Sequence, residues 1–129
     1  YLSHNPPFYP ELTGFENLQF WLRLNSLDFP DSKINELLAK VGLVMFSDDI
    51  AGNYSRGMIQ RLGFALSISH SPTTLLLDEP FTGLDDEGSE IIKEQLLKMK
   101  EEGCSILLSS HDPVKFSDRT LTLDEGALS

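Results

Sequence analysis

The sequence predicts an α/β protein in which a helical part is followed by two parallel strands. Two short apolar runs, Leu75–Leu77 and Ile106–Leu108, have the length of strands, and an amphipathic segment at about 86–102 separates them. A strand, a helix and a strand in this order form a βαβ unit, so we expect parallel strands joined by a right-handed crossover. Because neither run alternates with polar residues, we expect this sheet to be buried on both faces.

Three helices are expected in the first part of the chain. The first covers about 14–25 and begins at a capping box formed by Thr13 and Glu16. The second runs from Pro30 to a terminal glycine at Gly42, and the third covers about 56–70. The first helix has two apolar stripes, so it is either buried on two sides or offers one stripe as a docking groove. The stripes are Phe15, Leu18 and Leu22, and Phe20, Leu24 and Leu27.

The second part of the chain supplies the sheet. We expect strands at 74–78 and 105–108, with a helix at 86–102 between them whose acidic start and basic end match the helix dipole. Residues 120–128 resemble a β-hairpin. The chain is therefore expected to divide into a helical part, 1–72, and an α/β part, 73–129.

The composition restricts the partners and the compartment. The 129 residues include 20 acidic and 10 basic side chains, and the net charge of −10 disfavours nucleic acid or an anionic membrane surface as the main partner. The only cysteine, Cys104, fits a reducing compartment, and its apolar neighbours predict a buried, inert thiol. No apolar run approaches the ~18 residues of a membrane span. The chain begins without Met at what looks like the end of a strand, so we expect it to be part of a longer protein.

Asp78 and Glu79 directly follow the first strand, and His111 follows the second. The carboxyl ends of parallel strands form the edge at which open α/β sheets bind ligands. One carboxylate there can hold a metal while its neighbour acts as a base, as phosphoryl transfer requires. The alternative is a solvated acidic turn beside a partly buried, hydrogen-bonding histidine.

Ser55 and Gly57 stand at the start of the third predicted helix. Exposed N–H groups at a helix start bind phosphate, and Gly57 would let an anion or another backbone approach closely. The alternative is that Ser55 only caps its own helix. The spacing of Gly52 and Gly57 imitates a P-loop, but Met58-Ile59 replaces the Lys and the hydroxyl residue, so we reject a P-loop here.

Five segments in fixed order resemble the later part of an ATP-binding cassette, the nucleotide-binding domain of ABC transporters. Tyr54–Met58 resembles the signature motif, and Leu75–Pro80 resembles the Walker B strand with its catalytic Glu. Gly83–Asp85 matches the D-loop, Ser110–Asp112 matches the switch-histidine loop, and Tyr1–Leu18 matches the surroundings of the Q-loop. The resemblance implies a P-loop NTPase-like ABC ATPase fold, of which this chain holds the helical subdomain and the parallel-sheet half of the core.

Three positions depart from the family pattern. His4 takes the place of the Q-loop glutamine, and Arg56 and Met58 replace Gly and Gln in the signature. This combination resembles the ATPase subunit of the haem exporter, or cytochrome c-maturation, system. Related multidrug-type and sodium-type exporters also have Met in the signature, and whether His4 makes the usual glutamine contact stays open.

The resemblance implies ATP and Mg²⁺ as cofactors, with Asp78 supporting the metal. Glu79 would polarise the attacking water, and His111 would steady the γ-phosphate. The signature residues would reach ATP bound on a second subunit, in a head-to-tail dimer with Asp85 along its seam. The nucleotide-binding set implied is Ser55, Arg56, Gly57, Met58, Asp85 and His4.

The resemblance also implies a transporter subunit on the cytoplasmic face of the membrane, with a transmembrane permease docking near residues 8–27. Without a P-loop, the 129 residues alone are expected to be inactive. Two other classes remain: a soluble ABC-type ATPase of chromosome maintenance or DNA repair, and a degenerate, non-catalytic regulatory cassette. The first is disfavoured because residues 13–53 hold only two modest helices in place of a long coiled coil.

Overall fold

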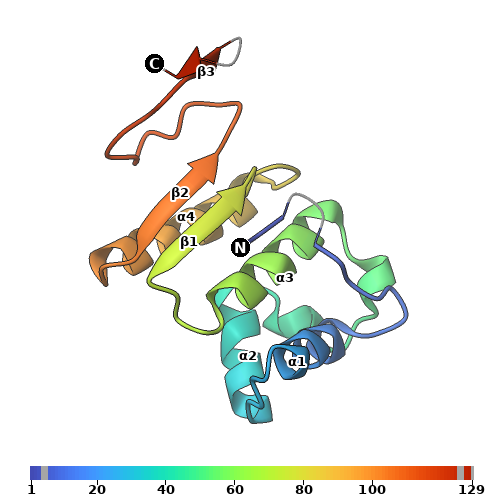
Figure 1. Ribbon diagram of the computed structural model, residues 1–129. Coiled ribbons are helices and arrows are strands. Elements are labelled where there is room, and N and C mark those ends of the chain that lie inside the picture. Colours follow the sequence, from blue (N-terminus) through green and yellow to red (C-terminus); the bar gives the residue numbers. More distant parts are fainter. Residues whose placement is uncertain (4–5, 125–126, 129) are drawn as a thin grey trace.

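The computed structural model describes residues 1–3, 6–124 and 127–128 (Figure 1). Its helices and strands follow the predicted order, and their ends differ from the predictions by a few residues. The elements are α1 (Gly14–Leu24), α2 (Asp31–Lys40), the short 3₁₀ turns η1 (Val44–Phe46) and η2 (Ala51–Asn53), α3 (Arg56–Ile68), β1 (Thr74–Asp78), α4 (Asp86–Glu101), β2 (Ser105–Ser109), β3 (Leu123–Asp124) and β4 (Ala127–Leu128).

The predicted βαβ unit is confirmed. Strands β1 and β2 pair in parallel, with Thr74 opposite Ser105 at one end and Asp78 opposite Ser109 at the other. Leu2 forms a parallel bridge with Leu77 on the other side of β1, so the start of the chain lies beside this strand. Helix α4 lies behind β1 and β2 in the view of Figure 1. The predicted hairpin strands are confirmed as the two-residue antiparallel pair β3 and β4, whereas the turn at 125–126 lies outside the described residues.

In the helical part, α1 starts and α2 ends where their capping residues predict. The Thr13 N–H donates to Glu16 Oε2 at 2.9 Å and the Glu16 N–H donates to Thr13 Oγ1 at 3.1 Å, which completes the capping box of α1. Gly42 has a φ of +69°, the left-handed conformation that ends a helix most easily at glycine. Among the described residues, no helix has both the length and the apolar character needed to cross a membrane.

One hydrophobic core joins the helices to the sheet. Its buried side chains come from α1, α2, α3, β1 and α4, and they include Leu18, Leu22, Ile34, Leu37, Leu38, Leu62, Phe64, Leu75, Leu77, Ile92 and Leu96. All four residues predicted to point inward from the second helix, Ile34, Leu37, Leu38 and Val41, are buried. The division into 1–72 and 73–129 remains a prediction.

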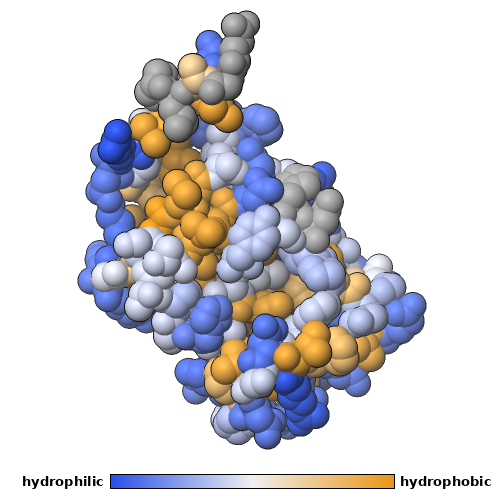
Figure 2. Space-filling view, in the orientation of Figure 1, coloured by the Kyte–Doolittle hydropathy of each residue, from blue (hydrophilic) through white to orange (hydrophobic). Residues whose placement is uncertain are grey.

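The prediction that the sheet is buried on both faces is wrong. Leu75 and Leu77 are buried, but Leu76 between them is 44% exposed, and Leu107 of β2 is 66% exposed. Successive strand residues point to opposite faces, and in the described part of the chain only the face toward α4 is covered. Figure 2 shows the opposite face as an apolar patch over β1 and β2.

The second apolar stripe of α1 is also open to solvent. Phe20 is 40% exposed and Leu24 is 62% exposed, whereas Leu27 is half-buried. The exposed Tyr9 ring packs edge-on against Phe20, with ring centroids 5.1 Å apart. Of the two interpretations of this stripe, burial on two sides is therefore wrong, and the docking groove remains a prediction.

Candidate active site

Asp78 lies at the carboxyl end of β1, where its carboxylate is held by the neighbouring strand. The Ser109 hydroxyl donates to Asp78 Oδ1 at 2.8 Å, and the two residues are partners in the parallel register. The sequence interpretation missed Ser109. It could have been found by aligning the two strands, because a β1 that ends at Asp78 places the end of β2 beside it.

Glu79 adopts a left-handed backbone conformation with a φ of +50°. Such a conformation costs a residue with a side chain about 1–3 kcal/mol and persists only where its surroundings fix it. Four hydrogen bonds do so here. The Glu79 N–H donates to Ser109 Oγ at 3.1 Å, and its carbonyl accepts from the Thr82 N–H at 3.1 Å and from Gln60 Nε2 at 3.3 Å. The Thr82 hydroxyl donates to Glu79 Oε2 at 3.3 Å, so the side chain is oriented as well.

His111 reaches the same corner, as predicted from its position after the second strand. Its Nε2 lies 3.5 Å from Glu79 Oε1, and its side chain is 95% exposed, whereas that of Glu79 is only 19% exposed. The structure therefore brings Asp78, Glu79 and His111 together at one edge of the sheet, with an imidazole on the solvent side of an oriented carboxylate.

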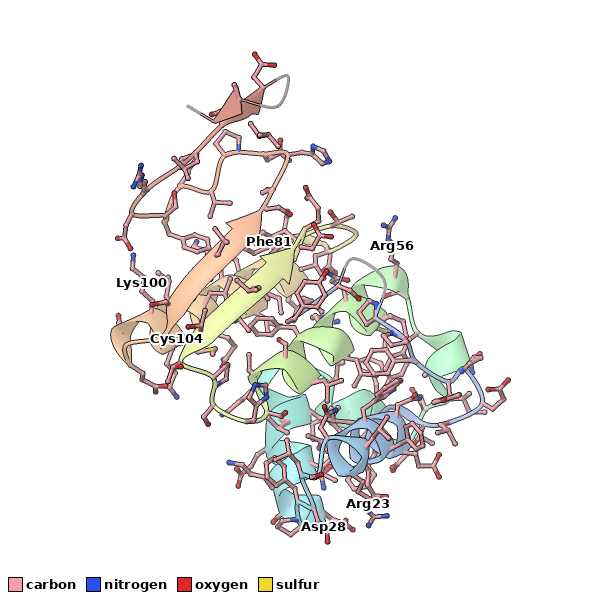
Figure 3. The ribbon with its side chains drawn as sticks, viewed as in Figure 1. Arg23, Asp28, Arg56, Phe81, Lys100 and Cys104 are labelled. Atoms are coloured by element: carbon pink, nitrogen blue, oxygen red, sulfur yellow. The ribbon has the colours of Figure 1, made fainter. Side chains whose placement is uncertain are left out.

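The residues that resemble the signature motif form a second group at the start of α3. The Met58 N–H donates to Ser55 Oγ at 3.1 Å, which confirms Ser55 as the N-cap. Ser55 and Arg56 are exposed, and Figure 3 shows Arg56 at the outer end of the helix. Met58 is half-buried against the core. Ser55 therefore caps α3 and is at the same time exposed to solvent.

Gly57 is the point at which the two groups meet. A Cβ atom on Gly57 would lie 2.8 Å from the carbonyl oxygen of Gly83, in the turn that follows Glu79. The sequence interpretation that Gly57 admits another backbone is therefore confirmed. Gln60, one turn later and buried, supplies the hydrogen bond to the Glu79 carbonyl. Helix α3 thus contacts both the backbone of Glu79 and the turn after it.

Asp85 caps α4, and His4 lies outside the described residues. The Asp85 carboxylate accepts a hydrogen bond from the Gly88 N–H at 2.8 Å, and the side chain is exposed at the end of the Gly83 turn. This N-cap accounts for Asp85 locally, so its place along a dimer seam remains a prediction.

The donor groups at Asp78 fit a magnesium ion that is bound together with a nucleotide. Mg²⁺ in such sites takes one or two carboxylates and completes its shell with phosphate and water. Half-buried Asp78 is one such carboxylate, oriented through Oδ1 by Ser109. Across the residues described, no group of three or more His, Cys, Asp and Glu side chains could enclose a metal. One oriented carboxylate is the protein's share of such a joint site.

Tyr54, the first residue of the segment that resembles the signature motif, is fixed by its hydroxyl group. This group donates to the Phe46 carbonyl at 2.6 Å and lies where a Cβ of Gly14 would be. Burial, followed by the nearby charges of Asp49 and Asp48, raises the pKa of Tyr54 from 10.0 to about 12. The neutral form is thus favoured in the folded state. Its contribution to stability is complete below pH 10 and is lost as the pH rises to about 12.

We expect Tyr54→Phe to lower the free energy of unfolding by about 1 kcal/mol at pH 8, through loss of this hydrogen bond. Because Phe does not ionise, the deficit relative to wild type should shrink between pH 10 and pH 12. Urea unfolding of both proteins at several pH values measures the difference. A deficit that stays constant over this range would contradict the assignment.

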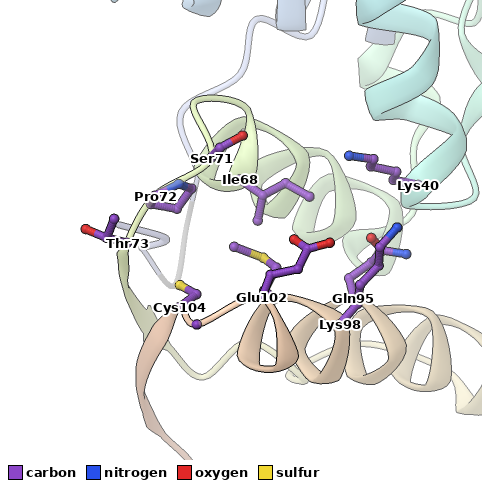
Figure 4. A pocket seen from close by; sticks show the side chains of 11 residues that line it. Lys40, Ile68, Ser71, Pro72, Thr73, Gln95, Lys98, Glu102 and Cys104 are labelled. Carbon is purple, nitrogen blue, oxygen red and sulfur yellow. The ribbon is translucent and has the colours of Figure 1, made fainter.

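A surface pocket of about 250 Å³ lies at the opposite end of the two strands (Figure 4). Its lining combines the chain just before β1 and β2 with the ends of α2, α3 and α4, and it includes Cys104, Lys40 and Lys98. Cys104 is half-buried and borders this pocket, so the prediction of a buried thiol is wrong. Cys104 precedes β2 by one position, and its N–H donates to the Met99 carbonyl of α4 at 2.9 Å. The pocket contains none of the predicted catalytic residues.

Comparisons with known proteins show which family this chain is similar to. The family model described as ABC transporter matches residues 1–82. The uncharacterized ABC transporter ATP-binding protein YdbJ of Bacillus subtilis (strain 168) is 36% identical over an alignment of 131 residues, covering 98% of this chain and 42% of YdbJ. The bacitracin transport ATP-binding protein BcrA of Enterococcus faecalis is 43% identical over 111 residues, covering 85% of this chain and 36% of BcrA. The chain thus spans less than half the length of these curated relatives.

A solved structure has the same fold. It is the dimeric, post-hydrolysis state of the ATP-binding cassette MJ0796 with ADP and Pi bound, and it matches with a TM-score of 0.75 at 24% identity. The match covers 86% of this chain and 51% of the MJ0796 chain. It confirms the predicted α/β fold of a P-loop NTPase-like cassette. With the family model spanning more than half of its residues, this chain belongs to the ATP-binding proteins of the ABC transporter family.

Proposed function

We propose that this chain is part of a subunit that hydrolyses ATP to power transport across a membrane. The meeting of Asp78, Glu79 and His111 at the carboxyl edge of β1 and β2 is the observation that supports the proposal most strongly. Phosphoryl transfer needs a carboxylate for the metal, a group that positions the attacking water, and a group that contacts the transferred phosphate. These three side chains have the chemistry for those three tasks.

Each residue has one role in the proposed reaction. Asp78 holds Mg²⁺, which when bound neutralises charge on the phosphates of ATP. Glu79 accepts a hydrogen bond from the attacking water and draws off its proton. His111, exposed beside Glu79, donates a hydrogen bond to the γ-phosphate. The hydrogen bonds to the backbone and side chain of Glu79 keep its carboxylate aimed at one place, so little reorientation is needed during the reaction.

The signature residues are proposed to act across a head-to-tail dimer. Ser55, Arg56, Gly57 and Met58 would contact ATP bound on a second subunit, with Asp85 at the seam and His4 near the metal. The exposed start of α3 supports this because its first N–H groups attract phosphate. The solved MJ0796 neighbour is itself described as a dimer. A loop outside these 129 residues would cradle the phosphates, so we propose that this chain alone does not hydrolyse ATP.

The partner in the membrane is proposed to dock on residues 8–27. The exposed side chains of Tyr9, Phe20 and Leu24 form an apolar stripe there, of the kind that receives an amphipathic helix. A transmembrane permease would place the subunit on the cytoplasmic face of the membrane. The net charge of −10 disfavours nucleic acid as a partner.

The identity of the transported substrate is the most specific part of the proposal. His4 with the Ser-Arg-Gly-Met sequence of residues 55–58 suggests haem export, whereas the relative BcrA is named for bacitracin transport. To distinguish haem from a peptide antibiotic as the substrate, the ATPase activity of the assembled transporter is measured with each compound added, and the transported compound should stimulate it. Stimulation by the antibiotic alone would remove the haem assignment.

Ser55→Asp tests whether Ser55 does more than cap α3. Asp caps a helix about as well as Ser, so the fold should be kept. Its negative charge would repel the γ-phosphate, and we expect the ATP concentration for half-maximal dimer formation to rise at least about tenfold, because like charges would face each other across the dimer. Light scattering of the complete subunit against ATP concentration measures this.

Ser55→Asn is the matched control, because it keeps both the cap and the neutral charge. It should form the ATP-dependent dimer nearly as wild type does. Wild-type dimer formation by Ser55→Asp would leave Ser55 as a local cap and remove it from the nucleotide site.

A further inference from the structure

We propose that Ser109 is a positioning residue for ATP hydrolysis, acting through both Asp78 and Glu79. The inference rests on the proposed function, because it concerns the same site. Ser109 ends β2 and lies opposite Asp78 in the parallel register. It touches neither the nucleotide nor the attacking water in this scheme. Its hydroxyl group instead fixes the two residues that do.

The hydroxyl group is used in both directions. It donates to Asp78 Oδ1 at 2.8 Å, and it accepts from the Glu79 N–H at 3.1 Å. A hydroxyl can serve as donor and acceptor at once, and no apolar side chain can replace either function. One atom on β2 thus ties the metal carboxylate to the backbone of the proposed base.

This tie matters because Asp78 and Glu79 have different backbone conformations. Asp78 is still part of the strand, whereas Glu79 turns into the left-handed region at a φ of +50°. Their side chains must nevertheless serve the same phosphate. Ser109 contacts both residues on either side of this change in direction, so it fixes how the metal carboxylate and the base are oriented toward each other.

Ser109 is also well suited to substitution. Its side chain is exposed, so removing the hydroxyl group leaves no buried cavity in the core. Ser109→Ala removes both hydrogen bonds, whereas Ser109→Thr keeps a hydroxyl group on the same Cβ, on a strand that favours β-branched residues. Ser105 provides a control, because it is an exposed serine at the other end of the same strand.

The experiment compares the wild-type, Ser109→Ala, Ser109→Thr and Ser105→Ala forms of the complete ATP-binding subunit. For Ser109→Ala we expect kcat to fall about 10- to 100-fold, the range typical of residues that orient metal ligands. The KM for ATP should change less than threefold (roughly), because the nucleotide contacts remain. Ser109→Thr should recover most of the lost kcat, and Ser105→Ala should equal wild type.

A second measurement does not depend on turnover. The Mn²⁺ dissociation constant of each form is measured by electron paramagnetic resonance with a non-hydrolysable ATP analogue bound. We expect it to rise for Ser109→Ala, because Asp78 loses the donor that orients it, and to return toward wild type for Ser109→Thr. Wild-type kcat and Mn²⁺ affinity in Ser109→Ala would overturn the inference, as would an equal loss in the Ala and Thr variants.

The activity of the wild-type protein distinguishes a failure of the proposed function from a failure of the role proposed for Ser109. If the complete wild-type subunit hydrolyses no ATP, the proposed function fails and the role of Ser109 in that reaction fails with it. If wild type is active and Ser109→Ala is equally active, only the role of Ser109 is overturned.

Discussion

Glu79→Gln is expected to lower ATP turnover by the complete subunit about 10²- to 10⁴-fold while leaving ATP binding intact. The amide has almost the shape of the carboxylate, but it cannot draw a proton from the attacking water. The Glu79 backbone bonds to Ser109, Gln60 and Thr82 do not involve the side chain, so the turn should keep its conformation. Because ATP stays bound unhydrolysed, the ATP-dependent dimer should persist. Phosphate release measures turnover, and light scattering measures the dimer.

Glu94→Gln provides the control for this substitution. Glu94 is exposed on α4, away from the strand ends, and the same loss of charge there should leave turnover unchanged. Hydrolysis at the wild-type rate by Glu79→Gln would exclude Glu79 as the base.

Gly57→Ala is expected to destabilise the protein by about 1–3 kcal/mol, the usual cost of adding volume to a packed contact. In most helix interiors the same change stabilises by about 0.5–1 kcal/mol, so the sign should be reversed here. The reason is that the new Cβ would lie 2.8 Å from the Gly83 carbonyl oxygen, a backbone atom that cannot rotate away. The turn from Glu79 to Asp85 would have to move, so ATP turnover should fall as well. Urea unfolding and phosphate release measure the two effects.

Asn35→Ala is the matched helix control. Asn35 is exposed on α2, so alanine gains helix propensity there without meeting another group, and stability should rise slightly. If Gly57→Ala also raised the free energy of unfolding, the close contact between α3 and the Gly83 turn would not constrain the protein.

The local pattern of the sequence was sufficient to predict the helices, the two parallel strands and the acid corner. The Thr13–Glu16 cap, the inward face of α2 and the approach of another backbone to Gly57 are short-range or steric properties, and all three are confirmed. His111 and Glu79 were expected at one sheet edge because parallel strands end together, and they lie 3.5 Å apart.

The features that the sequence did not predict depend on the register of the strands and on which elements cover the sheet. Ser109 and Gln60 reach Glu79 from 30 and 19 residues away in sequence, and no local pattern reveals such contacts. The apolar run of β1 shows that Leu76 suits burial, but whether anything covers it is decided by other elements. The same applies to Cys104, whose apolar neighbours do not close the pocket beside it. The proposed roles in nucleotide binding likewise depend on a second subunit, which the sequence pattern of one chain does not reveal.

The uncovered face of the sheet has a consequence for self-association. Thr73–Leu77 and Ser105–Ser110 are short, uncharged, proline-free segments with apolar centres, close in length and composition to the segments from which cross-β aggregates grow. Charged residues next to such segments act as gatekeepers, because stacking them in register brings like charges together. Asp78 and Glu79 stand directly after the first segment. The two carboxylates proposed for ATP chemistry are therefore also expected to oppose fibril formation by the strand that carries them.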